Sequence, residues 1–160
     1  MPSIGKILNV GCGRHVIPHT VPVDKTPGIQ EATVVWDADT GESMPFFDET
    51  IAGIHCYHML EHVEDPLWVI SEFDRVLAEW GTINIVVPYY MGGMAFQDLN
   101  HKHFFTEDTW RILFQNDRYD TMFGVADTPV NLSIQFNMVM GDSARTLALV
   151  TQLRKGAFPE

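Results

Sequence analysis

The sequence is poor in cysteine and in basic residues, and it has no long apolar run. Its two cysteines, Cys12 and Cys56, are too few for a disulfide framework or a cysteine-rich zinc site, and they suit a reducing cytoplasm. Ten Lys and Arg face 21 Asp and Glu, and the resulting net charge of −11 argues against nucleic acid and anionic membranes as partners. No apolar run approaches the roughly 18 residues of a membrane span, and the N-terminus lacks the pattern of a signal peptide. We therefore expect a cytoplasmic protein that has neither a membrane nor a nucleic acid as partner.

The chain that remains after these exclusions has 160 residues, of which 46% are hydrophobic, the ordinary share for a globular protein. A chain of this length can bury one sizeable core, and it has no room for two full-sized catalytic domains. We expect a single domain over residues 1–155, followed by a flexible tail over residues 156–160.

Short apolar runs rich in β-branched residues predict most of the sheet. They are nearly continuous in apolar character, which is typical of parallel strands buried on both faces. The later runs 131–140 and 145–154 predict an antiparallel hairpin, and residues 118–125 predict another extended piece. The predicted buried strands cover residues 6–10, 21–24, 32–36, 50–56 and 82–87.

Two helices are predicted between these runs. Asp65 is a good N-cap with Pro66 at the first helical position, and apolar residues at helical spacing follow until Gly81. A second helix is expected to begin at Thr106, where early acidic residues precede Trp110. The pattern predicts an α/β fold of three layers, with a mostly parallel sheet completed by a C-terminal antiparallel hairpin.

Residues suited to a nucleotide follow three of the predicted strands. Gly11 and Gly13 follow the first strand, where the backbone can turn sharply and approach a ligand closely. Asp24 ends the second strand and could accept hydrogen bonds from a ribose diol. Asp37 follows the third strand and could reach an adenine amino group, with the amide of Ala38 beside it. Because open α/β sheets bind ligands at the carboxyl ends of their parallel strands, this pattern favours a nucleotide-like ligand over simple loop capping.

Six segments, taken in order, make the chain resemble the class I S-adenosylmethionine-dependent methyltransferases, in particular their small type 11-like group. The resemblance covers residues 6 to about 109. This family includes a subgroup in which a short proline-containing loop replaces the first helix. Residues 14–20 are similar to that loop. The resemblance implies a Rossmann-like three-layer sandwich with S-adenosyl-L-methionine as cofactor. The segments are Leu8–Gly13, Val21–Asp24, Trp36-Asp37 with Met44–Asp48, His58–Val63, Glu72–Leu77 and Asp98–Thr106.

The same resemblance implies the residues that bind this cofactor and the reaction that follows. Methyl transfer to an oxygen or nitrogen of a small molecule or sugar is the activity that we expect. Besides this acceptor, the expected partners include a second copy of the chain or a different partner subunit, and the sequence leaves both open. The implied binding residues are Gly11, Cys12 and Gly13 at the methionine part, Asp24 at the ribose hydroxyls, Asp37 and Ala38 at adenine, and Cys56, Tyr57 and His58 at the sulfonium end.

Histidines are the candidates for the catalytic base, because imidazole titrates near neutral pH. We expect His101 to take this role, since its segment follows the fifth predicted strand, and His58 is the second candidate. The structural alternative is that these imidazoles fill loops or bond backbone carbonyls. No metal is expected in this interpretation.

Two other functions compete with methyl transfer. The segment His58-x-x-Glu61-His62 fits the inverted zincin pattern of a zinc hydrolase, with Glu61 as base and His101 or Asp98 as a further ligand. This pattern directly follows a predicted strand, and a new helix begins at Asp65, so barely one turn is left for a metal-binding helix. The other alternative is a non-catalytic subunit or sensor that binds S-adenosyl-L-methionine. Residues 89–96 are expected to form either a mobile lid or an ordinary apolar loop.

Overall fold

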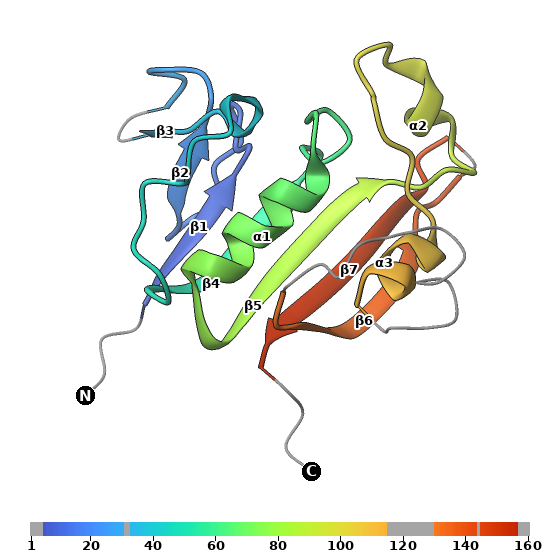
Figure 1. The fold of residues 1–160 in the computed structure, drawn as a ribbon. Helices are drawn as coiled ribbons and strands as arrows, with labels where there is room; N and C mark the ends of the chain where they lie inside the picture. The colour runs from blue at the N-terminus through green and yellow to red at the C-terminus, as the bar shows by residue number, and fades with distance from the viewer. Residues whose placement is uncertain (1–4, 31–32, 115–129, 144, 157–160) are drawn as a thin grey trace.

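A mixed sheet of seven strands runs through the computed structural model, which describes residues 5–30, 33–114, 130–143 and 145–156 (Figure 1). Strands β1 to β5 pair in parallel, and β7 lies antiparallel to both β5 and β6. The order across the sheet is β3-β2-β1-β4-β5-β7-β6, which confirms the predicted Rossmann-like α/β fold with its C-terminal hairpin. The strands are β1 Lys6–Val10, β2 Val21–Asp24, β3 Val34–Val35, β4 Ile51–Tyr57, β5 Leu77–Pro88, β6 Leu132–Met140 and β7 Ala148–Lys155.

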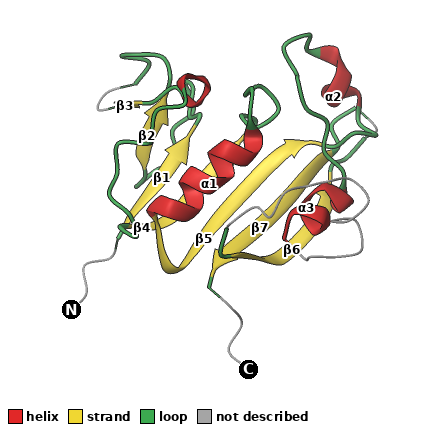
Figure 2. Cartoon of the chain, in the orientation of Figure 1, coloured by secondary structure: helices red, strands yellow, loops and turns green. Residues whose placement is uncertain are grey.

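Three α-helices and one 3₁₀ turn accompany the sheet among the described residues: α1 (Pro66–Val76), α2 (Gly93–Gln97), α3 (Glu107–Phe114) and η1 (Ala38–Thr40). Figure 2 shows α1 and α3 in front of the sheet. Helix α1 begins as predicted, since the Asp65 carboxylate accepts hydrogen bonds from the backbone N–H groups of Leu67 and Trp68. None of the described helices is long and apolar enough to cross a membrane.

The core lies between α1 and the sheet. Its residues are fully or almost fully buried, and burying one such aliphatic or aromatic side chain contributes about 1.5–3 kcal/mol. This packing fixes the sheet so that the carboxyl ends of the parallel strands meet along one edge. The sheet contributes Leu8, Val10, Ile54, Cys56, Ile83 and Ile85, and α1 contributes Val69, Ile70, Phe73 and Val76.

The end of α1 differs from the prediction. The helix does not continue to Gly81 but ends at Val76, because Leu77 already has extended backbone (φ −71°, ψ 129°) and begins β5. The predicted strand from Thr82 is therefore only the second part of a 12-residue strand. The β-branched run from Thr82 marks the part of β5 that pairs continuously with β4 and β7. The helical spacing of Leu77 was misleading, because Leu77 pairs with Ile51 on β4.

Two other connections bear on the predictions. Residues 11–20 form a loop between β1 and β2, as the family resemblance implied, and the Asn9 side chain accepts a hydrogen bond from the Ile17 N–H (3.0 Å). Strand β3 has two residues and is shorter than predicted. The expected extended piece over 118–125 and the start of the third predicted strand lie outside the described residues.

Candidate functional site

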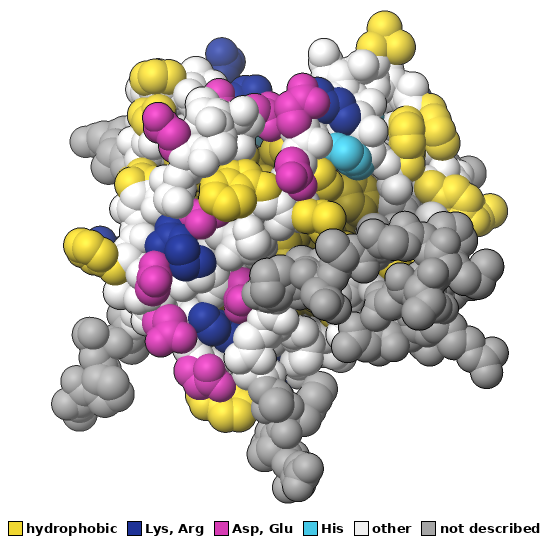
Figure 3. Space-filling view, in the orientation of Figure 1, with side chains coloured by type: hydrophobic (Ala, Val, Ile, Leu, Met, Phe, Trp, Pro, Cys, Tyr) yellow, Lys and Arg dark blue, Asp and Glu magenta, His cyan; other side chains and the backbone are white. Residues whose placement is uncertain are grey.

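A cavity of about 580 Å³ opens where β1, β2 and β4 end. Figure 3 shows acidic and basic side chains gathered along this upper edge of the molecule. The cavity therefore lies at the carboxyl edge of the parallel strands, where sheets of this type bind ligands. Its lining residues are Val10, Gly11, Asp24, Lys25, Trp36, Asp37, Ala38, Asp39, His58, Met59, His62, Val63, Leu99, Asn100 and Lys102.

The glycine turn after β1 forms one wall of the cavity. Gly11 has a φ of +67°, and a Cβ atom there would lie 2.7 Å from the Cβ of Met59, so only glycine fits. Gly13 has a φ of +50°, and a Cβ atom there would meet nothing within 4 Å. The turn is fixed to β2 by hydrogen bonds from the Gly11 N–H to the Val23 carbonyl (2.8 Å) and from the Gly13 N–H to Asp24 Oδ2 (2.9 Å).

Asp24, at the end of β2, has both a structural contact and remaining hydrogen-bonding capacity. Its two carboxylate oxygens accept one hydrogen bond each, from the backbone N–H groups of Gly13 and Thr26, both at 2.9 Å. A carboxylate oxygen has two lone pairs, so each can accept a further bond from a ligand hydroxyl. The backbone amides thus hold the carboxylate in place at the cavity wall.

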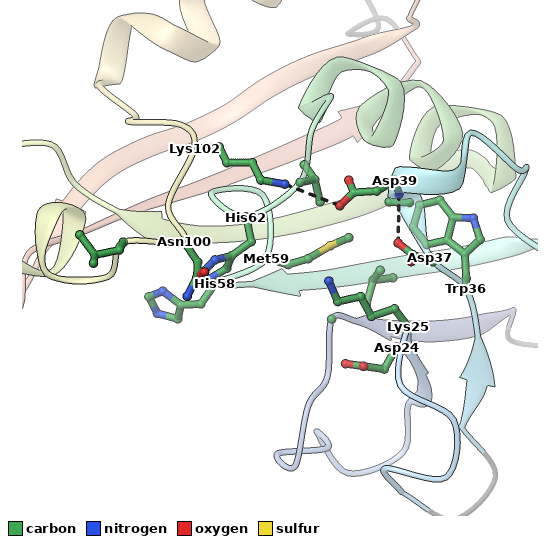
Figure 4. Close-up of a pocket in the computed structure, with 15 residues that line it drawn as sticks. Asp24, Lys25, Trp36, Asp37, Asp39, His58, Met59, His62, Asn100 and Lys102 are labelled. Atoms are coloured by element: carbon green, nitrogen blue, oxygen red, sulfur yellow. Dashed lines mark hydrogen bonds and ion pairs between the residues drawn. The ribbon is translucent and has the colours of Figure 1, made fainter.

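The wall after β3 combines an aromatic ring with a short turn (Figure 4). Trp36 is buried, and its indole N–H donates to the Glu42 carbonyl (2.8 Å). Asp37 caps η1 by accepting a hydrogen bond from the Asp39 N–H (3.1 Å), which turns the buried Ala38 toward the cavity. Together these residues offer a flat apolar surface beside polar groups, which suits a heteroaromatic base.

Histidines occupy the other end of the cavity. Figure 4 shows His58 and His62 together, with Met59 between them and the Asp24 and Trp36 end. His58 has left-handed backbone (φ +52°), and its Nδ1 lies 3.3 Å from Oε1 of the buried Glu61. The ring of His101 packs edge-on against that of His62, with centroids 4.7 Å apart. Two segments far apart in the sequence therefore bring their imidazoles together here.

Lys102 connects the loop after α2 to the opposite wall. Its ammonium lies 2.7 Å from Glu64 Oε1 and 3.8 Å from Asp39 Oδ2, and the hydrogen bond with Glu64 raises the pKa of Lys102. The backbone N–H of Lys102 also donates to the Glu61 carbonyl (2.7 Å). These contacts hold the segment with Leu99 and Asn100 over the cavity.

Of the residues predicted for the site, five line the cavity and five do not. Burial raises the pKa of the thiols of Cys12 and Cys56, and both side chains lie in the core. Tyr57 bonds to His55 through its hydroxyl (3.0 Å), and His101 reaches the cavity only through its contact with His62. The lining residues are Gly11, Asp24, Asp37, Ala38 and His58, and the others are Cys12, Gly13, Cys56, Tyr57 and His101.

Several lining residues were not singled out from the sequence. Met59 lies in the same segment as the predicted His58, and Leu99 and Asn100 lie in the same segment as His101, whereas His62 was considered from the sequence only as a zinc ligand. The neighbourhood was therefore predicted, but only the side chains with obvious chemistry were chosen. Lys102 carried no signal, because its role depends on tertiary contacts with distant acids.

The zinc hydrolase interpretation required a helix through residues 58–62. Those residues form a bend and a turn between β4 and α1, so His58 and His62 do not share a helix face. This confirms the expectation that the short segment between the strand and the helix capped by Asp65 leaves no room for a metal-binding helix.

Comparison with known proteins agrees with this geometry. Residues 8–85 match the family model of a methyltransferase domain, which spans β1 to the middle of β5 and so includes most of the cavity wall. No curated protein sequence matches the chain. Over residues 8–85, the chain is therefore similar to a methyltransferase domain. The resemblance to the type 11-like group is thereby confirmed, and the family implies S-adenosyl-L-methionine as cofactor.

Solved structures of methyltransferases share the fold at low sequence identity. A chain from the complex between the Haloferax volcanii Trm112 methyltransferase activator and a methyltransferase is 14% identical (TM-score 0.71, covering 100% of this chain and 86% of that chain). A SAM-dependent methyltransferase from Methanosarcina mazei is 17% identical (TM-score 0.62, 98% and 94% covered). The [4+2]-cyclase SpnF is 12% identical (TM-score 0.67, 96% and 75% covered). The fold alone therefore does not determine the reaction.

The residues at the cavity fit this cofactor. The turn leaves room for a ligand to approach the backbone at Gly13, since a Cβ atom there would meet nothing within 4 Å. Asp24 retains acceptor capacity for ribose hydroxyls, and Trp36 supplies a flat wall for adenine. The volume, about 580 Å³, lies within the range of cofactor sites.

Proposed function

We propose that this chain transfers a methyl group from S-adenosyl-L-methionine to an oxygen or nitrogen of a small molecule or sugar. One observation carries the proposal: a single cavity connects the strand-end carboxylates of Asp24 and Asp37 to a group of histidines at its opposite end. The first end suits a nucleoside, and the second suits an acceptor that must lose a proton.

In this proposal Asp24 accepts hydrogen bonds from the ribose hydroxyls, while Asp37 and the Ala38 amide contact adenine beside Trp36. The turn at Gly11 lies nearest the methionine part. These assignments are supported by the presence of Gly11, Asp24, Asp37 and Ala38 in the cavity wall.

The cofactor supplies a methyl group that its positively charged sulfur already activates. The chain must align the acceptor, exclude water and take up a proton. The acceptor lone pair forms the new bond to the methyl carbon as the carbon–sulfur bond breaks, and that electron pair stays on sulfur. The acceptor proton passes to the imidazole of His58, which lines the cavity and lies beside the Glu61 carboxylate. A neighbouring carboxylate favours the protonated imidazole that results.

His58 replaces His101 as the first candidate for the base. His101 does not line the cavity, and its Nδ1 already bonds the Ala95 carbonyl (2.9 Å). His58 has an exposed side chain (43%) and borders the cavity directly, so an acceptor can reach it.

The loop after β5 is the proposed acceptor-binding wall. The Phe96 and Phe104 rings stack with centroids 4.7 Å apart, although both are largely exposed. Leu99 is 98% exposed and lines the cavity. An exposed aliphatic side chain in the cavity wall suits an acceptor with an apolar part, and in this proposal the two phenylalanine rings of the same loop extend that apolar surface.

A methyl-transfer assay tests the activity. Purified chain is incubated with methyl-labelled S-adenosyl-L-methionine and a panel of hydroxyl and amine acceptors, and the labelled product is counted. His58→Gln should lower kcat by at least about 100-fold, because a general base contributes that much. His55→Gln is the matched control, since that histidine bonds Tyr57 and does not line the cavity. Equal rates for both variants would remove His58 from the reaction.

A partner subunit is a further part of the proposal. Its support is the likeness to a chain from a complex of a methyltransferase with its Trm112 activator. If a partner completes the site, the purified chain alone should bind the cofactor but turn over slowly. Light scattering of the purified chain, compared with its rate in the assay, separates a self-sufficient monomer from a subunit.

A further inference from the structure

A carboxylate and two imidazoles meet at the histidine end of the cavity, and the proposed reaction uses only the carboxylate, as the neighbour of His58. One ligand atom from each of Glu61, His62 and His101 lies within 4.8 Å of the other two. Around a tetrahedral cation with bonds of 2.0–2.2 Å, ligand atoms are about 3.4 Å apart, so small side-chain rotations would close this set. Glu61 and His62 come from the turn after β4, and His101 comes from the loop after α2.

The Glu61 carboxylate is the observation that requires a ligand. Glu61 is 1% exposed, and neither of its carboxylate oxygens has a hydrogen-bond partner among the described residues. His58 Nδ1 lies 3.3 Å from Oε1, which is an ion-pair contact only when that imidazole is protonated. A buried carboxylate is costly unless it is paired, hydrogen-bonded or bound to a metal. A cation between Glu61 and the two imidazoles would neutralise it.

His101 is already oriented as a metal ligand. Its Nδ1 lies 2.9 Å from the Ala95 carbonyl oxygen, and because a carbonyl only accepts, Nδ1 carries the hydrogen. Its Nε2 therefore has a free lone pair. A backbone carbonyl that fixes the tautomer of a histidine is the usual second partner of a metal-bound imidazole.

We propose that Glu61, His62 and His101 bind one divalent first-row transition cation, and that its open positions hold the acceptor oxygen. Two imidazoles with one carboxylate suit Zn²⁺, Mn²⁺ or Fe²⁺ better than Mg²⁺, which prefers oxygen ligands. His62 lines the cavity, so the cation would lie at the cavity wall. The binding of the acceptor to the cation rests on the proposed function. It narrows the acceptor to a hydroxyl compound, because the cation would raise the acidity of that hydroxyl group.

Cation binding is tested without methyl donor or acceptor. The full chain is stripped with a chelator and titrated with Zn²⁺ in a calorimeter, and its thermal unfolding is followed with and without the cation. We expect about one equivalent bound per chain and a higher unfolding temperature in Zn²⁺, because a ligand of the folded state stabilises it.

Glu61→Gln and His101→Gln should each weaken Zn²⁺ binding by at least about tenfold, while His55→Gln, a histidine outside the group, should bind as the wild type does. If one variant fails to fold, the other still decides. Zn²⁺ binding that is absent, or equal in wild type and in both variants, overturns the site. If methyl transfer proceeds unchanged in the chelated chain, only the role of the cation in acceptor binding is overturned. If the chain binds Zn²⁺ but not the cofactor, the proposed function is rejected and the metal site is retained.

Discussion

Two glycines with the same backbone conformation show what the turn after β1 requires. Gly11 (φ +67°) and Gly28 (φ +69°) both have left-handed backbone, which disfavours any side chain. A Cβ atom at Gly11 would lie 2.7 Å from the Cβ of Met59, whereas one at Gly28 would meet nothing within 4 Å. Of these two glycines, Gly11 alone combines the conformational demand with a demand for space, and it alone lines the cavity.

Substitution of these two glycines separates the two demands. Gly28→Ala should lower the free energy of unfolding by about 1–2 kcal/mol, the cost of a left-handed non-glycine residue. Gly11→Ala should cost about 1–3 kcal/mol more, because the added methyl forces Met59 to move, and it should also weaken cofactor binding. Urea denaturation and calorimetry measure both effects. Equal losses of stability with unchanged binding would contradict this account of the turn.

How much of the site the sequence predicts depends on what each residue contributes. The glycine turn, Asp24 and Asp37 were predictable, because strand ends and residue types are local signals. Glu61 and His62 were noticed only as part of a zinc hydrolase pattern that required a helix. Their actual meeting with His101, like the ion pair of Lys102 with Asp39, depends on contacts between segments that are far apart in the sequence. Cys56 and Tyr57 show the converse: their place beside a strand end was predicted, yet neither side chain lines the cavity.

At the scale of elements, Arg75 fastens α1 to the segment that precedes β4. Its guanidinium donates to the carbonyls of Met44 and Phe46 and forms ion pairs with Asp48 and with the buried Glu72. The hydrogen bond with Glu72, together with Asp48, raises the pKa of Arg75, so the charge is always present. One side chain thus holds the helix against a loop that has no regular structure of its own.

Removal of Arg75 should expose how much that contact contributes. Arg75→Met should lower the free energy of unfolding by about 3 kcal/mol, because the buried Glu72 carboxylate loses its counter-charge. Arg75→Lys keeps the charge without the forked geometry and should cost less. Urea denaturation at neutral pH compares the two variants, and a loss below 1 kcal/mol for Arg75→Met would contradict the assigned role.

A second connection, between the end of β5 and α3, makes stability depend on alkaline pH. Desolvation, together with the hydrogen bonds to the Glu107 carboxylate (3.0 Å), raises the pKa of Tyr89 to about 12. The folded chain then holds this proton above pH 10, where an unfolded tyrosine releases it. The contribution to stability is therefore complete below about pH 10 and is lost as the pH rises toward 12.

Denaturation at pH 9 and pH 11 tests this link. The wild-type chain should lose more stability between these pH values than Tyr89→Phe, which has no proton to release. Identical pH dependence in the two proteins would place the alkaline sensitivity elsewhere.

The elements themselves were largely predictable from apolar patterning. The strands and the start of α1 follow from β-branched runs and from the Asp65-Pro66 cap. The predicted position of the junction between α1 and β5 was wrong, because Leu77 fits both the helical spacing and the strand. Only its pairing with Ile51 on β4 decides between the two. The five-residue helix α2 was missed because it is too short to show a periodic pattern.

At the scale of the whole molecule, a sheet of seven strands and three α-helices account for most of the described residues. The cavity lies at one edge of this sheet, and its walls come from the strand ends and from the loop after α2. In the proposed reaction, selection of the acceptor would therefore fall to that loop or to a second chain. The net charge of −11 includes Asp24 and Asp37 at the cavity, and many of the remaining acids are exposed.

The most direct test of the central claim is a calorimetric titration of the purified chain with S-adenosyl-L-homocysteine, the demethylated product of the cofactor. We predict about one molecule bound per chain, and at least about tenfold weaker binding for Asp24→Asn, which leaves ribose hydroxyls poorly paired. Asp108→Asn, which changes an exposed carboxylate on α3, is the matched control and should bind as the wild type does. Absence of binding by the folded wild-type chain, or equal affinity in all three proteins, would contradict the account.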